Sequence, residues 1–194
     1  MIVLDLCAGT GSATQAFRDR GHDVDTLDII GGHTFNMDVR KFKPWKKYDF
    51  IWSSPPCTEF SIAKGISCKD RNPDLSLVEA CIRICKTAPY WILENPRDCL
   101  RYIIGKPVVT VKYSDYGAVF PTKYREGVVC TKPTDLWGCF PWFWSNEQPQ
   151  KQQLLKDGIQ ALGSRSAMRA MVPYGLSLAI CTAIERDLDV HPKL

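Results

Sequence analysis

The chain has 194 residues, a formal net charge of +4 and an apolar content of 45%. These values are typical of one globular domain with its own hydrophobic core, and they argue against a disordered or fibrous protein. No segment approaches the roughly 18 consecutive apolar residues of a membrane-spanning helix. The opening residues, MIVLDLCAGTG, lack a basic leader and a cleavage site, so we expect a cytoplasmic protein.

The chain contains nine cysteines and three histidines. An odd number of cysteines at irregular spacings favours reduced thiols over a disulfide framework in a chain of this size. Cys81 and Cys85 are spaced to share one face of a helix. There is no C-x-x-C pair, and we therefore expect no metal site.

Apolar runs and turn residues predict elements along the whole chain. In chain order these are strand 2–6, helix 13–20, strand 22–29, strand 48–54, helix 72–89, strand 90–95, strand 107–113 and helix 173–188. Strands that alternate with helices predict an α/β fold with a doubly wound, mostly parallel sheet. The segment 114–164 is rich in Pro, Gly and Trp; we predict that it is irregular and functional.

A glycine-rich loop follows the first predicted strand. Gly9 and Gly11 permit a sharp turn and the close approach of a ligand, and the following helix N-terminus favours an anionic group. Asp28 ends the second predicted strand, where a carboxylate can accept hydrogen bonds from ribose hydroxyls. Thr14 replaces the third glycine of a dinucleotide fingerprint, which favours a nucleoside-type cofactor over NAD. Asp38 is either an adenine contact or a solvated loop residue.

The stretch SSPPCTEFS places Cys57 directly after a strand and two prolines. Proline fixes its own backbone dihedral and leaves no N–H to satisfy, so this loop is stiff enough to hold a nucleophile at a strand end. The alternative is that Cys57 is a small buried hydrophobe, which is how we interpret the other eight cysteines. The flanking prolines favour the nucleophile.

A second unusual residue is Glu94, which ends the apolar run YWIL. A carboxylate in such a place costs free energy unless it has a partner or is protonated. It is therefore a candidate acid or hydrogen-bond partner for a ring nitrogen. A structural ion pair with an arginine is the alternative.

Taken together, DLCAGTG, SSPPCTEFS and ILENP resemble the glycine loop, the Pro-Cys loop and the Glu-Asn strand end of the cytosine-C5 DNA methyltransferases, in that order. SDYGAVFPTKYRE and RAMVPYGLSLAICTAI look like two later segments of that family, and TKPTDLW resembles a feature of its small, often phage-borne members. The similarity covers residues 1–125 and 165–188. It implies a Rossmann-like S-adenosylmethionine-dependent methyltransferase fold over 1–194, with 165–188 returning to the catalytic core.

The resemblance also implies a covalent mechanism on a cytosine flipped out of duplex DNA. Cys57 would attack C6 of the ring while Glu94 engages N3 and the exocyclic amine, so that C5 takes the methyl group of S-adenosylmethionine. The implied catalytic residues are Pro56, Cys57, Glu94, Asn95 and Arg125, with Lys123 as an alternative to Arg125. The implied cofactor residues are Asp5, Cys7, Gly9, Gly11, Asp28, Ile29, Asp38, Val39 and Pro55.

The sequence departs from the family pattern at several points. Cys7 replaces a phenylalanine, Thr58 a glutamine, and the segment with two arginines keeps only Arg125. Lys132-Pro133-Thr134 is an alternative match to that segment. The large target-recognition region is reduced to residues 127–163, so we expect a short recognition site or little sequence preference.

The basic runs 41–47, 64–71 and 122–127 suit a polyanion if they gather on one rim, and are solvated surface otherwise. The expected partner is duplex DNA, bound by a monomer. Alternatives are the same chemistry on RNA or a free pyrimidine nucleotide, and a non-catalytic nucleic-acid-binding relative. The presence of both Cys57 and Glu94 argues against the last.

Overall fold

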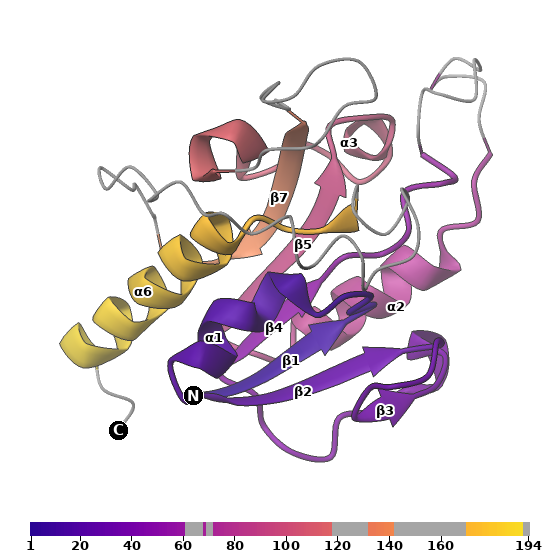
Figure 1. The fold of residues 1–194 in the computed structure, drawn as a ribbon. Helices are drawn as coiled ribbons and strands as arrows, with labels where there is room; N and C mark the ends of the chain where they lie inside the picture. The colour runs from indigo at the N-terminus through magenta and orange to yellow at the C-terminus, as the bar shows by residue number, and fades with distance from the viewer. Residues whose placement is uncertain (61–67, 69–71, 118–131, 142–169, 192–194) are drawn as a thin grey trace.

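The computed structural model describes residues 1–60, 68, 72–117, 132–141 and 170–191. A central sheet runs through this part of the chain, with strands in the order β3-β2-β1-β4-β5-β7-β6 (Figure 1). The strands are β1 (Ile2–Leu6), β2 (Asp23–Asp28), β3 (Phe35–Asn36), β4 (Phe50–Ser53), β5 (Tyr90–Pro96), β6 (Val109–Lys112) and β7 (Pro133–Cys139). Strands β3, β2, β1, β4 and β5 are parallel, and β7 runs antiparallel to both β5 and β6. The predicted α/β class with a doubly wound, mostly parallel, Rossmann-like sheet is confirmed.

Helices cover both faces of the sheet (Figure 1). The α-helices are α1 (Gln15–Asp19), α2 (Ser76–Cys85), α3 (Leu100–Ile103) and α6 (Tyr174–Val190), and the 3-10 turns are η1 (Ser12–Thr14), η2 (Val39–Lys41) and η5 (Tyr113–Tyr116). Alternation along β4 divides the core, because successive side chains point to opposite faces. Phe50 and Trp52 join the cluster under α1 and α6, while Ile51 joins the cluster under α2.

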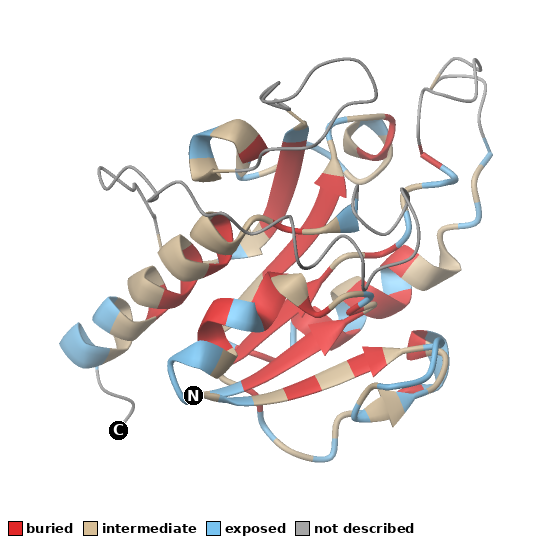
Figure 2. Cartoon of the chain, in the orientation of Figure 1, coloured by how far each residue is buried: buried red, intermediate tan, exposed pale blue. Residues whose placement is uncertain are grey.

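The central strands β1, β4, β5 and β7 are buried along most of their length, as Figure 2 shows. Four consecutive residues of β1 and all of β4 are buried, which is the pattern of parallel strands covered on both faces. Because β1 lies between β2 and β4, the chain moves outward in one direction through β2 and β3 and in the other direction from β4 onward. The carboxyl ends of β1 and β4 therefore form the crevice where sheets of this kind bind ligands.

The segment predicted to be irregular contains β7, so that prediction was wrong for residues 133–139. Asp135 in this strand is fully buried, and Arg101 neutralises it through a bidentate contact with both carboxylate oxygens. Gly138 is required here, because a Cβ at this position would lie 2.0 Å from the Trp91 carbonyl oxygen of β5. The strand is difficult to predict from the sequence, because Asp135 and Gly138 are residue types that are common in loops and rare in strands.

The prediction that all cysteines are reduced was also wrong, since Cys68 and Cys99 form a disulfide. Cys99 follows β5, and its N–H donates to the Phe60 carbonyl at 3.1 Å, which brings the segment after Cys57 beside it. Proximity of this kind comes from the fold, because the two cysteines lie 31 residues apart in sequence. Cys81 and Cys85 are both buried on α2, as predicted.

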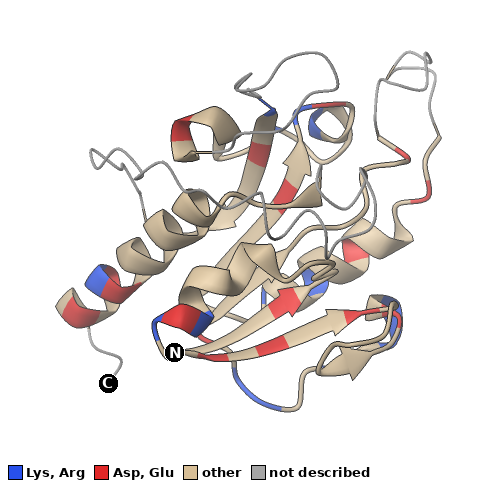
Figure 3. Ribbon diagram, in the orientation of Figure 1, with Lys and Arg blue, Asp and Glu red and all other residues tan. Residues whose placement is uncertain are grey.

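The basic run 41–47 does not gather on the rim formed by the carboxyl ends of the strands. It begins in η2, and by Lys46 it has reached the opposite end of the sheet, where Lys46 pairs with Asp23 and Asp25 at the start of β2 (Figure 3). Residues 122–127, and all of 64–71 except Cys68, lie outside the described residues. Within the described ranges, no helix has both the length and the apolar character to cross a bilayer.

Candidate active site

The glycine loop leaves β1 at the crevice and is built around left-handed backbone. Gly9 has φ +52° and Gly11 φ +69°, values that favour glycine. The Gly9 N–H donates to the Asp28 carboxylate at 2.9 Å, which ties the loop to the end of β2. A Cβ on Gly9 would have no atom within 4 Å, so open space remains beside the loop for a ligand.

The loop after β2 presents apolar side chains next to Asp28. Ile29 and Ile30 are 73% and 69% exposed, which is unusual for large aliphatic residues. The Ile30 N–H donates to the second oxygen of Asp28 at 3.0 Å, so the carboxylate is fixed between the two loops. A carboxylate beside exposed apolar surface fits a nucleoside, with ribose hydroxyls on the former and a base on the latter.

Asp38 and Val39 have roles that the sequence did not assign. Asp38 caps η2 by accepting from the Arg40 N–H, and it pairs with the Arg40 guanidinium at 2.6 Å. The hydrogen bonds from Arg40 lower the pKa of Asp38 to about 2, so the group is a carboxylate. Val39 is buried in the core below α2. Both side chains therefore support the fold at this strand end.

Asp5 lies fully buried near the carboxyl end of β1. Its Oδ2 accepts from the Thr14 hydroxyl at 2.8 Å, whereas Oδ1 is buried and has no hydrogen-bond partner among the described residues. Burial raises the pKa of Asp5 to about 7, although the Thr14 hydrogen bond and the nearby Arg18 charge oppose the shift. A buried acceptor without a partner next to the glycine loop fits a site that a polar ligand completes.

Cys7 begins the same loop in the left-handed conformation, with φ 56°. Its side chain packs against the core below α2, where its thiol interacts with that of Cys81. The hydrogen bond with Cys81, together with burial, holds the pKa of Cys7 well above its usual range. This residue therefore anchors the loop to α2.

The C-terminal segment packs onto the other side of the glycine loop. The Val172 N–H donates to the Ser12 hydroxyl at 2.9 Å, and the Ser177 hydroxyl donates to the Ala13 carbonyl at 2.7 Å. These bonds join segments that are more than 150 residues apart in sequence, and they fix the entry to α1.

The loop that carries Cys57 is held at several points. The Asn95 amide donates to the Pro55 carbonyl at 2.9 Å, which ties the loop after β4 to the end of β5. The Phe60 N–H donates to the Cys57 carbonyl at 2.9 Å, so a turn closes directly after the thiol. Phe60 itself is buried. These contacts hold the loop on both sides of Cys57.

Three charged side chains act on the Cys57 thiol. Burial raises its pKa above the ordinary value, the Lys132 charge lowers it, and the charges of Glu94 and Asp98 raise it. Cys57 is half-buried, so a ligand can reach it. The Cys57 thiol therefore lies near one cationic side chain, Lys132, which opposes the effect of burial on its pKa.

Glu94 is buried at the end of β5 with 5% exposure. The Tyr113 hydroxyl donates to its Oε1 at 2.9 Å. Tyr113 is itself fully buried, and the Lys132 ammonium lies 4.5 Å from the centroid of its ring. The register of β6 with β7 pairs Lys112 with Pro133 and thereby sets Tyr113 opposite Lys132.

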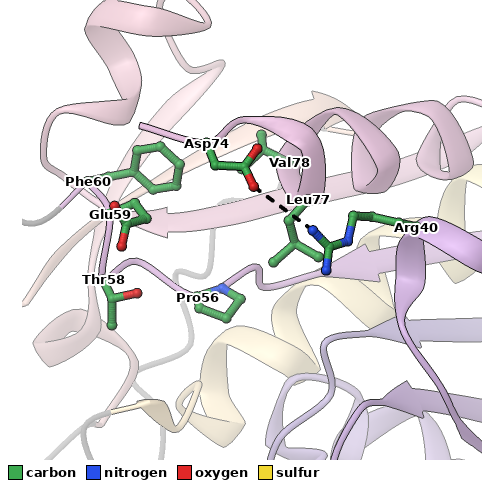
Figure 4. Close-up of a pocket in the computed structure, with 8 residues that line it drawn as sticks. All are labelled: Arg40, Pro56, Thr58, Glu59, Phe60, Asp74, Leu77 and Val78. Atoms are coloured by element: carbon green, nitrogen blue, oxygen red, sulfur yellow. Dashed lines mark ion pairs between the residues drawn. The ribbon is translucent and has the colours of Figure 1, made fainter. Parts of the chain in front are cut away.

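A cavity of about 160 Å³ adjoins the Cys57 loop on the side of α2 (Figure 4). Arg40 and Asp74, 4.0 Å apart, form an ion pair at its wall. Its lining residues come from η2, the Pro-Cys loop, α2 and the segment just before α2: Arg40, Pro56, Thr58, Glu59, Phe60, Asp74, Leu77 and Val78.

The structure brings Cys57, Glu94 and Asn95 together at the ends of two adjacent parallel strands, as their register requires. Arg125 and Lys123 lie outside the described residues, as do residues 127–131 and 142–163 of the expected recognition segment. Lys132, an alternative match in the sequence, acts on Cys57. Tyr113 was missed, since its partner Glu94 lies 19 residues earlier in the chain.

The sequence matches no protein-family profile. It also matches no curated protein. Among solved structures, a Thermoplasma acidophilum protein is similar at 16% identity, with 71% of this chain and 77% of that chain covered and a TM-score of 0.44.

Two further solved structures are similar at the same low level. The magnesium protoporphyrin IX methyltransferase of Synechocystis, solved with bound SAM, shares 14% identity over 71% of this chain and 68% of its own, with a TM-score of 0.39. A mutant of DNMT2 from Spodoptera frugiperda shares 17% identity over 66% of this chain and 54% of its own, with a TM-score of 0.37. Likenesses at this level assign no function, so the function is inferred from the site.

Proposed function

We propose that this protein transfers a methyl group from S-adenosylmethionine to C5 of a cytosine in DNA, through a covalent bond between Cys57 and C6 of the ring. The observation that carries the proposal is the pairing of Cys57 with Glu94 at the carboxyl ends of neighbouring strands, with the glycine loop on the next strand. A nucleophile, an acid and a nucleoside-type loop at one crevice are the parts that this reaction needs.

The residues beside β1 and β2 fit S-adenosylmethionine. The open space at Gly9 admits a ligand against the backbone, and the unpartnered Oδ1 of Asp5 is a buried acceptor for a polar group. Asp28 would hold the ribose hydroxyls and Ile29 would pack against the purine. When bound, the cofactor supplies an electrophilic methyl group.

The chain's own residues activate the pyrimidine. Cys57 as thiolate forms a bond to C6 while Glu94 gives a proton to N3, so the electron pair of the ring double bond becomes available at C5. Lys132 stabilises the thiolate, and transfer of the Glu94 proton to the ring accompanies the attack. Once C5 carries the methyl group, a water molecule takes the C5 proton, the C6–S bond breaks to release the Cys57 thiolate, and N3 returns its proton to Glu94, which restores the aromatic ring.

DNA is the proposed substrate because a base bound at this crevice must leave its stack to reach Cys57, which is half-buried at a strand end. Lys132 and the exposed Arg97, which follows the Glu94 strand, place positive charge beside the crevice. Positive charge at this place favours a polyanion such as DNA as the molecule that carries the base to Cys57 and Glu94.

The test is to incubate the protein with S-adenosylmethionine and mixed-sequence duplex DNA and to measure 5-methylcytosine in the digested DNA by mass spectrometry. Single-stranded DNA, RNA and free cytidine nucleotides run in parallel. Product on duplex DNA supports the proposal. Product confined to RNA or nucleotides would correct the substrate, and absence of product on all four would overturn the activity.

A further inference from the structure

We propose that Tyr113 is a specificity-determining residue, which makes the pyrimidine site select a 4-amino ring (cytosine) over a 4-oxo ring (uracil or thymine) by fixing which oxygen of Glu94 accepts and which donates. The inference deepens the proposed function and rests on it. It starts from the hydrogen bond of 2.9 Å between the Tyr113 hydroxyl and Glu94 Oε1, both groups being buried.

Tyr113 is a fixed donor. Burial and the Glu94 carboxylate hold the pKa of Tyr113 well above its usual range, so the phenol keeps its proton at every working pH. The ring is fully buried in the cluster that contains Val111, Leu136 and Val172. The Tyr113 oxygen also interacts with the Thr134 side chain, whose effect on the Tyr113 pKa is downward, as expected of a donor to that oxygen. Lys132 packs over the ring.

A fixed donor on Oε1 decides the state of the carboxyl group. A proton on Glu94 goes to Oε2, because a proton on Oε1 would make that oxygen a poorer acceptor for the phenol. The protonated group therefore presents an acceptor at Oε1, which has a second lone pair, and a donor at Oε2. Without Tyr113 the two arrangements of the proton would be nearly equivalent.

The pattern of acceptor and donor matches only one class of pyrimidine. Cytosine offers an amine hydrogen at C4 and an acceptor at N3, which pair with Oε1 and with the Oε2 proton. Uracil offers a carbonyl oxygen at C4 and a hydrogen at N3. The C4 oxygen would then face the acceptor Oε1, and the N3 hydrogen would face the Oε2 proton. A site built to bond one polar pattern rejects its inverse strongly, because buried groups are left unpaired.

The experiment measures both substrates in one tube. Mixed-sequence duplex DNA is combined with the same DNA after deamination of its cytosines to uracil, and S-adenosylmethionine carries an isotopically labelled methyl group. Labelled 5-methylcytosine and labelled thymidine are then counted separately by mass spectrometry. Because both products come from one preparation, their ratio does not depend on how much of a variant is folded.

Tyr113→Phe should lower the ratio of cytosine to uracil methylation by about tenfold to a hundredfold, the usual worth of one well-placed polar recognition contact. Tyr48→Phe is the matched control, since it removes a buried hydroxyl that donates to Asp25 at 2.8 Å at the opposite end of the sheet. This control should keep the wild-type ratio.

A ratio that is unchanged in Tyr113→Phe, with both rates reduced equally or not at all, would overturn the inference and leave the proposed function intact. An inactive wild type would overturn both. If Tyr113→Phe does not fold, Glu94→Gln supplies a second test, because its amide keeps an acceptor and a donor in the same places. Glu94→Gln should bind cytosine DNA in preference to uracil DNA; equal binding would contradict the role of Tyr113.

Discussion

Two buried tyrosines donate to buried carboxylates at opposite ends of the same sheet. Tyr113 donates to Glu94 at 2.9 Å beside the carboxyl ends of the parallel strands, and Tyr48 donates to Asp25 at 2.8 Å near their amino ends. The bonds are alike, but the lysines beside them differ. Lys46 lies 2.8 Å from the Asp25 carboxylate, whereas Lys132 lies over the ring of Tyr113.

The difference separates a structural pair from one suited to chemistry. Asp25 bonds directly to the Lys46 ammonium, so the two side chains form an ordinary ion pair. The cation near Glu94 is stacked on the tyrosine and acts on Cys57 as well. In the second arrangement one lysine lies near both the Cys57 thiol and the Tyr113–Glu94 pair.

The largest effect is expected at the nucleophile. Cys57→Ser should reduce methyl transfer to DNA by at least about 10⁴-fold, because the hydroxyl is a much weaker nucleophile than a thiolate. Cys139→Ser is the matched control, since Cys139 is an exposed free cysteine at the end of β7. Rates of methyl transfer measured with labelled cofactor give both values. Transfer that survives in Cys57→Ser would exclude the covalent mechanism.

Removal of the acid should have the next largest effect. Glu94→Gln keeps the shape of the side chain and the acceptor for Tyr113 but has no proton to transfer, so we expect a loss of about 10²-fold to 10⁴-fold. The corresponding change at the other pair, Asp25→Asn, should lower the free energy of unfolding and leave the specific activity of the folded protein unchanged. Steady-state rates and denaturant unfolding distinguish the two. Equal losses of activity would remove the contrast between the pairs.

A smaller effect is expected from the lysines. Lys132→Met should raise the pKa of Cys57 further, because the Lys132 charge is what opposes the upward shift from burial. A thiol with a higher pKa is less ionised at any pH below it, so the alkylation rate of Cys57 at neutral pH should fall by roughly threefold to tenfold, since one pKa unit is a factor of ten. The rate profile should move to higher pH.

Iodoacetamide labelling followed by peptide mapping reads Cys57 separately from the other thiols. Lys46→Met serves as the control, since Lys46 bonds Asp23 and Asp25 at the far end of the sheet. The alkylation profile of Cys57 should be the same in this control and in the wild type. A Lys132→Met profile displaced to lower pH would contradict the sign of the interaction.

The smallest effect is expected for the structural tyrosine. Tyr48→Phe should lower the free energy of unfolding by about 1 kcal/mol, the net worth of one buried hydrogen bond whose acceptor keeps a second partner. Lys46 is that second partner of Asp25. Urea denaturation measures the change, and methyl transfer should stay at the wild-type rate. A loss of activity in Tyr48→Phe would contradict a purely structural role for the Tyr48–Asp25 pair.

The sequence was sufficient to predict the central strands and the loops at their ends. Strands β1 and β4 are mostly apolar because both of their faces are covered, and turn residues bound them. Cys57 and Glu94 stand out for the same reason, since each is a reactive side chain directly after such a run. Strands and the unusual residues at their ends can therefore be predicted from neighbouring residues in the sequence.

Residues whose roles depend on distant partners could not be predicted. Asp135 is tolerated inside β7 only because Arg101 reaches it from α3. Tyr113, at the end of β6, meets Glu94 of β5 only because both strands pair with β7, which lies between them. Cys68 and Cys99 likewise come together through the fold. Sequence spacing predicts faces and turns, whereas pairings across the sheet follow from register.

The most direct test of the account is to trap the bond between Cys57 and the ring. Duplex DNA with 5-fluorocytosine in place of cytosine has no C5 proton to lose, so the ring cannot be released once it is methylated. With S-adenosylmethionine present, we predict a stable protein–DNA adduct, with the modified nucleotide located on Cys57 by peptide mass spectrometry. An adduct on another cysteine, or methylation of ordinary DNA with no adduct on fluorinated DNA, would contradict the central claim.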